Sequence, residues 1–140
     1  MSGYSGTPLA KKLGIRSGSR LLVRGAPPNY RKLVAPLPAG VRMVRRADSA
    51  TDILHLFVTA RTRLAQQLRQ ALAAMRPDAA IWVSWPKKAS GVASDLSEDT
   101  IRALAIPLGL VDIKVCAVDE TWSALKLVIR KAKRATTAGS

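Results

Sequence analysis

Two short apolar runs on either side of a long helical stripe constrain the fold of this chain more than any other feature. Residues 53–58, apart from His55, and residues 80–85 are mostly apolar and have the length of one strand each. Between them, from Arg61 onward, apolar side chains recur at helical spacing, and Pro77 ends that helix. Two apolar strands joined by a helix predict parallel pairing within an α/β domain.

The segments before this unit extend the same pattern. Strands are predicted at residues 20–25 and 41–44, and short helices at residues 7–14 and 30–35. Pro8 suits the start of the first helix because its ring fixes φ near the helical value. The N-terminal third therefore continues the alternation of helices and strands.

The segments after the central unit predict one helix and a hairpin. Asp95 and Glu98 have the spacing of a capping box, with Asp95 at the cap, and predict a helix running to about Ala105. Residues 111–118 and 123–130 are strands joined by a short turn, which favours an antiparallel hairpin. The predicted fold class is therefore α/β: a three-layer, Rossmann-like, mostly parallel sheet with a C-terminal antiparallel hairpin.

The size and composition of the chain fit one globular domain, since 140 residues are 48% hydrophobic. We predict a single α/β domain over residues 1–131 and a flexible basic and polar tail over residues 132–140. No apolar run approaches the roughly 18 residues of a membrane span. The N-terminus lacks the charged start and apolar centre of a signal peptide. We therefore expect a cytoplasmic protein without a membrane partner.

The net charge of +14 is concentrated at the two ends of the chain. Residues 1–46 hold ten Lys and Arg and no acid, and residues 126–140 hold five more, again with no acid. The middle, residues 47–125, has eight basic and nine acidic residues. If the ends meet in the fold, they form one positive face that suits a phosphate-bearing ligand or nucleic acid.

The closing hairpin, at residues 110–130, resembles that of the class I methyltransferases. The architectural resemblance covers residues 18–131. It implies a reduced methyltransferase-like fold, in which one strand–helix unit is missing around residues 45–52.

Three motifs also resemble an uncharacterised bacterial family, one of the domains of unknown function. The motifs are YSGTPLAKKLG at residues 4–14, SWPKKASG at residues 84–91 and DETWS at residues 119–123. The match spans nearly the whole chain and implies a bacterial protein. It supplies no activity, because the family has none assigned.

The turn after residues 80–85 is the main candidate site. Pro86 fixes the chain as it leaves the strand, and Gly91 permits a tight bend. Between them Lys87, Lys88 and Ser90 supply ammonium and hydroxyl donors close to the next helix, a combination that suits an anion such as phosphate. The alternative is a solvated basic turn after a core strand.

Other polar and aromatic side chains are predicted near the same edge of the sheet. In open α/β sheets ligands bind outside the carboxyl ends of the strands, where residues 25–30, 59–61 and 86–91 should meet. Candidates to line a pocket there are Tyr30, Thr59, Arg61, Trp85, Asp119, Glu120 and Trp122.

A cofactor site is not predicted. S-adenosylmethionine or a dinucleotide needs a glycine-rich first loop, but residues 25–29 have one glycine and two prolines. Where such folds place an acid for the ribose hydroxyls, this chain has Arg45 and Arg46, which cannot accept those bonds. His55 is the only histidine and is expected in the core, so no catalytic or metal-binding set is predicted either.

Three functions remain open from the sequence. We favour a non-catalytic methyltransferase-like domain that binds a phosphate-bearing ligand, a nucleotide or nucleic acid, through the basic turn. The alternatives are a small enzyme that acts on an anionic substrate with Lys87 or Lys88 and Asp119 or Glu120, and a protein-interaction subunit whose hairpin edge pairs with another chain.

Overall fold

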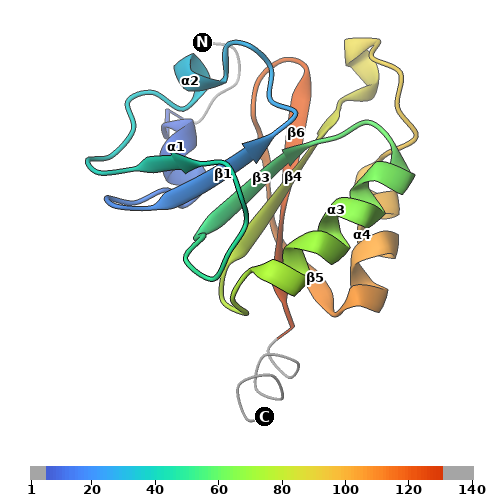
Figure 1. Cartoon of the computed structure of the whole chain (residues 1–140). Helices are drawn as coiled ribbons and strands as arrows, with labels where there is room; N and C mark the ends of the chain where they lie inside the picture. Colours follow the sequence, from blue (N-terminus) through green and yellow to red (C-terminus); the bar gives the residue numbers. More distant parts are fainter. Residues whose placement is uncertain (1–5, 131–140) are drawn as a thin grey trace.

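The computed structural model describes residues 6–130 and contains one six-stranded sheet with helices on both faces (Figure 1). The strands are β1 (Arg20–Arg24), β2 (Arg42–Val44), β3 (Ile53–Phe57), β4 (Ala80–Pro86), β5 (Leu110–Ala117) and β6 (Trp122–Ile129). The helices are α1 (Leu9–Lys12), α2 (Tyr30–Leu33), α3 (Arg61–Ala74) and α4 (Glu98–Ala105), with 3-10 turns η1 (Lys88–Ser90) and η2 (Ile106–Leu108).

The strand order is β2-β1-β3-β4-β6-β5. The first four strands in this order are parallel, and β6 runs antiparallel to both β4 and β5. Residues 45–52 form only turns between β2 and β3. The predicted α/β class with its mostly parallel sheet and closing antiparallel hairpin is therefore confirmed.

Each face of the sheet has its own apolar core. Helices α3 and α4 cover one face, where Leu64, Leu68 and Ile101 are fully buried. Helices α1 and α2 cover the other face, where Leu13 and Trp82 are fully buried. The indole Nε1 of Trp82 donates to the carbonyl of Leu13 at 3.0 Å, which ties α1 to the centre of the sheet.

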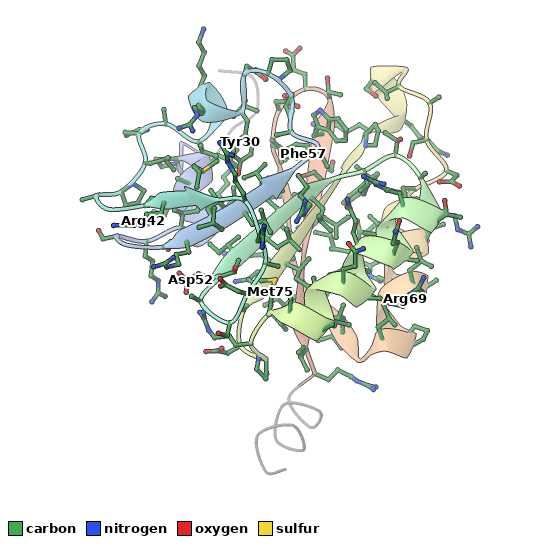
Figure 2. All side chains as sticks on the ribbon, in the orientation of Figure 1. Tyr30, Arg42, Asp52, Phe57, Arg69 and Met75 are labelled. Atoms are coloured by element: carbon green, nitrogen blue, oxygen red, sulfur yellow. The ribbon has the colours of Figure 1, made fainter. Side chains whose placement is uncertain are left out.

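His55 lies in the second core as a hydrogen-bonded residue, as the sequence predicted. Its Nδ1 is 2.9 Å from the Tyr30 hydroxyl, and its Nε2 is 2.6 Å from Oγ of Ser84. The rings of His55 and Phe57 stack with centroids 4.4 Å apart, and Figure 2 shows Phe57 near Tyr30. Burial lowers the pKa of His55 to about 3, so the imidazole is neutral.

The start of α4 differs from the prediction. Its N-cap is Ser97, whose Oγ accepts from the Thr100 amide, while Thr100 Oγ1 accepts from the Ser97 amide at 2.6 Å. Asp95 does not cap α4, and Glu98 instead pairs with Arg102. Asp95 reaches α3, where its Oδ1 accepts from the Arg61 amide at 2.8 Å.

Three further expectations concern the edge of the sheet, membrane-spanning helices and the C-terminal tail. Strand β5 is one edge, with a register shift between Asp112 and Lys114 and with Ile113 and Val115 exposed. Within residues 6–130 no helix has the length and apolarity needed to cross a bilayer. The predicted flexible tail, residues 132–140, lies outside the described residues.

Candidate functional site

A hollow of about 480 Å³ lies at the carboxyl ends of β1 and β3, beside the start of α3. We call it the crevice. Its lining consists of Val23, Arg24, Gly25, Phe57, Val58, Thr59, Ala60, Arg63 and Gln67. This is the edge where open α/β sheets bind ligands, and the volume is in the range of small-molecule sites.

The chain leaves β1 in a conformation that only glycine adopts easily. Gly25 has φ +73°, and a Cβ at this position would stand 2.6 Å from the carbonyl oxygen of Phe57. Because that neighbour is backbone on β3, a larger residue would force the two strand ends apart. The small size of Gly25 thus serves contact between strands rather than approach to a ligand.

The start of α3 is fixed by the loop that follows β4. Asp95 accepts from the Arg61 amide, its own amide donates to Thr59 O at 3.2 Å, and Ser94 Oγ donates to the same oxygen at 2.8 Å. Arg63 and Gln67 are four residues apart on this helix and therefore share one of its sides. The loop anchors the helix whose side chains line the crevice.

Gln67 carries the one buried side-chain polar atom within residues 6–130 that has no hydrogen-bond partner, its Oε1. Leaving such an acceptor unpaired costs roughly 1–3 kcal/mol. Gln67 lines the crevice and also a second, smaller hollow that shares Arg24 with it. Its side chain thus brings an unpaired buried acceptor to the lining of the crevice.

The charge of the crevice is positive. Arg24 and Arg63 are both exposed, and neither forms an ion pair with any residue of 6–130. The hydroxyl of Thr59 and the amino end of α3 lie on the same lining. Guanidinium groups beside a helix start favour a carboxylate or phosphate.

The basic turn predicted from the sequence follows β4, and its donors are used within the protein. Lys87 Nζ donates to the carbonyl of Asp119 at 2.7 Å, and the Lys87 amide donates to Thr121 O at 2.8 Å. Ser90 Oγ donates to Lys87 O at 2.6 Å. The carbonyl of Lys88 accepts from the Gly91 amide at 3.3 Å, but its exposed side chain makes no hydrogen bond or ion pair with residues 6–130. The Lys88 ammonium is therefore the group of this turn most open to a ligand.

The structure brings only part of the predicted pocket together. Among the residues predicted to form a site, Thr59 alone lines the crevice, and Arg61 follows it at the start of α3. Tyr30 and Trp85 are buried in the two separate cores. Burial raises the pKa of Tyr30, and its hydroxyl is held by His55.

The hairpin turn between β5 and β6 holds the remaining predicted residues. The Asp119 carboxylate accepts from the amides of Thr121 and Trp122 at 2.9 and 2.8 Å, so it shapes the turn. Glu120 is exposed. Trp122 contacts Phe57 edge-on, with ring centroids 5.0 Å apart. Within residues 6–130, neither the Asp119 nor the Glu120 carboxylate forms an ion pair with Lys87 or Lys88, and the Lys87 ammonium donates to the Asp119 backbone instead.

Three polar residues of the crevice were missed from the sequence: Arg24, Arg63 and Gln67. Arg24 ends the first strand next to Gly25, a position that the strand-end rule could have marked. Arg63 and Gln67 lie on the polar side of a helix with many polar residues, so their spacing alone does not distinguish them from solvated side chains.

The residues at the strand ends do not fit S-adenosylmethionine, the cofactor of the methyltransferase fold. The first turn contains Pro27 and Pro28, which have no amide proton to donate. After β2, the Asp48 carboxylate already accepts from the Ala50 amide at 2.8 Å, and the neighbouring Arg45 and Arg46 are cations. Within residues 6–130 no group of three or more His, Cys, Asp or Glu could hold a metal ion.

Comparison with solved structures supports the fold. A SAM-dependent methyltransferase from Aquifex aeolicus superposes with a TM-score of 0.59 at 14% identity, covering 87% of this chain and 88% of that one. The tRNA methyltransferase TrmK of B. subtilis gives 0.54 at 10% identity, covering 88% and 65%. TrmN from Thermus thermophilus gives 0.57 at 12% identity, covering 87% and 47%.

These similarities establish a methyltransferase-like fold and nothing narrower, because the identities are low. No protein-family model matches the sequence, and no curated protein matches it. The resemblance to a bacterial family of unknown function therefore stays a prediction.

Proposed function

We propose that this methyltransferase-like domain binds a phosphate-bearing ligand of nucleotide size at the carboxyl edge of its sheet and does not transfer methyl groups. The ligand's phosphate lies between Arg24 and Arg63, with the Thr59 hydroxyl as a further donor. The basic turn of Lys87, Lys88 and Ser90 lies farther along the same edge, and Lys88 extends the positive charge there.

The convergence of Arg24 and Arg63 on one hollow is the observation that carries this proposal. Two guanidinium groups without acidic partners repel each other, and an anion between them removes that repulsion. The unpaired Oε1 of Gln67 adds a second requirement, since it favours a ligand with an N–H or O–H donor. A nucleotide supplies both the phosphate and such donors.

The same charges argue against methyl transfer. S-adenosylmethionine carries a sulfonium cation, which a crevice with two arginines repels. Two positions of the first turn, Pro27 and Pro28, have no amide donor for the cofactor, and the acid after β2, Asp48, already accepts from the Ala50 amide. The solved methyltransferases that resemble this protein therefore support its fold, but they do not assign methyl transfer to it.

Isothermal titration calorimetry tests the proposal with AMP, ATP and inorganic phosphate at low salt. The combined variant Arg24→Gln/Arg63→Gln is expected to weaken nucleotide binding roughly tenfold or more per arginine, because each loss removes a charge-assisted hydrogen bond. The matched control, Arg69→Gln/Arg130→Gln, removes the same charge from exposed positions away from the crevice. It is expected to bind as the unchanged protein does.

Two outcomes would overturn the proposal. One is absence of binding by all three phosphate compounds, and the other is equal weakening in both variants, which would indicate net charge rather than a site. A separate titration with S-adenosylmethionine is expected to give no heat. Micromolar binding of that cofactor would contradict only the statement that the protein does not transfer methyl groups.

The variant Lys88→Gln is expected to weaken the binding of ATP more than the binding of AMP, since Lys88 lies farther along the edge of the sheet than the two arginines.

A further inference from the structure

A second concentration of positive charge lies on β5 and β6, on the face of the sheet that α1 covers. Lys114 of β5 and Lys126 of β6 are directly opposite each other in the antiparallel register. Lys126 is half-buried and Lys114 is exposed, and neither forms an ion pair with residues 6–130. Like charges directly opposite on paired strands destabilise a sheet.

Arg16, from the turn after α1, is the third cation of this group. Arg16 and Lys126 line a hollow of about 390 Å³, together with the Ser17–Gly18–Ser19 turn. Burial lowers the pKa of Lys126, and the charges of Lys114 and Arg16 lower it further. We call Arg16, Lys114 and Lys126 the hairpin cations.

The acids beside the hollow do not neutralise the hairpin cations. Asp52 and Asp78 line it, but both are paired with Arg76, at 2.6 and 2.7 Å. Asp52 also accepts from the Arg20 amide at 2.7 Å. All nine Asp and Glu residues of the chain lie within the described residues, and none of them forms an ion pair with the three cations.

We propose that the hairpin cations bind the phosphate backbone of a single-stranded nucleic acid, at a site separate from the crevice. Three neighbouring cations that form no ion pair within residues 6–130 carry a local energetic cost that the fold retains, and local conflicts of this kind mark functional sites. A phosphodiester strand places successive phosphates along a surface and releases counterions when they are neutralised.

The shape of the site favours a flexible strand over a lipid surface. Lys126 is half-buried at the side of a hollow, where a phosphate group can enter but a flat bilayer makes less contact. The hollow lies at the amino ends of β3 and β4, beside Asp52 and Ala80, whereas the crevice adjoins Phe57 at the carboxyl end of β3. Figure 2 shows Asp52 and Phe57 at opposite ends of the strand.

A gel-shift series with a 20-nucleotide oligouridine at several salt concentrations tests this site. The triple variant Arg16→Gln/Lys114→Gln/Lys126→Gln is expected to weaken binding at least tenfold at low salt. The slope of log affinity against log salt is expected to become shallower by about two, since each phosphate contact on a single strand contributes roughly 0.7. The control, Arg31→Gln/Arg45→Gln/Arg69→Gln, has the same net charge and is expected to change both quantities much less.

The stability of the variants separates loss of a site from loss of folding. Replacing the hairpin cations removes repulsion, so the triple variant is expected to melt at or above the temperature of the unchanged protein. If it does not fold, Lys114→Gln alone, at an exposed position, is expected to lower the slope by about 0.7.

Three results would overturn the proposal. The first is equal weakening in the triple variant and its control, or no binding of oligouridine at low salt. The second is binding of AMP that depends on the hairpin cations as strongly as oligouridine binding does, which would assign a single-phosphate site. The third is binding to phosphatidylserine vesicles that is tighter than binding to oligouridine and that depends equally on the hairpin cations. Arg24→Gln/Arg63→Gln is expected to retain oligouridine binding, so this proposal and the nucleotide proposal fail independently.

Discussion

At the scale of single residues, the buried chain of Tyr30, His55 and Ser84 links α2 to the centre of the sheet. Each end of the imidazole has a hydrogen-bond partner, so a polar ring is held in an apolar core without an unpaired atom. The sequence predicted that His55 lies in the core, because it stands in the middle of an apolar strand. Its partners were not predictable, since they lie 25 and 29 residues away.

This histidine gives the protein a defined pH dependence. The pKa of His55 is about 3 in the folded protein and about 6.5 when unfolded, so only the unfolded chain takes up a proton between these values. The contribution of the neutral, buried His55 to the free energy of unfolding is complete above about pH 6.5. As the pH falls below this value, the free energy of unfolding decreases by up to about 1.4 kcal/mol per pH unit. Urea unfolding at pH 6.5, 6.0, 5.5 and 5.0 measures this slope.

The variant His55→Gln supplies the comparison. It has no titrating ring, so its free energy of unfolding is expected to change much less over the same pH range, whatever its absolute stability. Parallel pH profiles for the two proteins would show that His55 does not titrate as its burial implies.

At the scale of elements, the loop from Lys87 to Ser97 determines how α3 and the crevice are positioned. The sequence predicted α3 from its apolar periodicity and α4 from a capping-box spacing that assigned Asp95 to the wrong helix. Asp95 and Glu98 have the spacing of a capping box, and so do Ser97 and Thr100. The folded chain places Asp95 at α3, 34 residues earlier than its own position, and local spacing cannot show such a contact.

Asp95→Ala is therefore expected to destabilise the protein by about 1 kcal/mol, the usual effect of removing a carboxylate that caps a helix start. Denaturant unfolding measures the change. Glu120→Ala is the matched control, because Glu120 is an exposed acid that forms no hydrogen bond or ion pair within residues 6–130, and it is expected to be nearly neutral. Equal effects of the two variants would contradict the role of Asp95 in fixing α3.

At the scale of the whole molecule, most of the positive charge is not neutralised by ion pairs within residues 6–130. Apart from Lys12, the cations that form ion pairs within residues 6–130 are Arg76 and Arg102. The sequence predicted a single positive face if the basic ends met, and Arg16 and Lys126 do meet, at one side of a hollow. Arg24 and Arg63 lie in the crevice instead. Charge counts show the excess, but only the sheet topology shows how it is divided.

The fold was more predictable from the sequence than the site, because the fold follows from local patterns and the site does not. Strand and helix periodicity is local, so the mostly parallel sheet and its closing hairpin follow from the order of the elements. The crevice is assembled from Gly25, Thr59 and Gln67, which are far apart in the sequence and come together only when β1, β3 and α3 pack.

The measurement that tests the nucleotide site most directly is an amide NMR titration of the ¹⁵N-labelled protein with AMP at low salt. The largest shifts are expected at Gly25, Thr59, Ala60 and Arg63, together with the side-chain amide of Gln67, whose Oε1 gains a partner. These shifts are expected to disappear in Arg24→Gln/Arg63→Gln. Shifts centred on other residues, or none at millimolar AMP, would contradict a nucleotide site in the crevice.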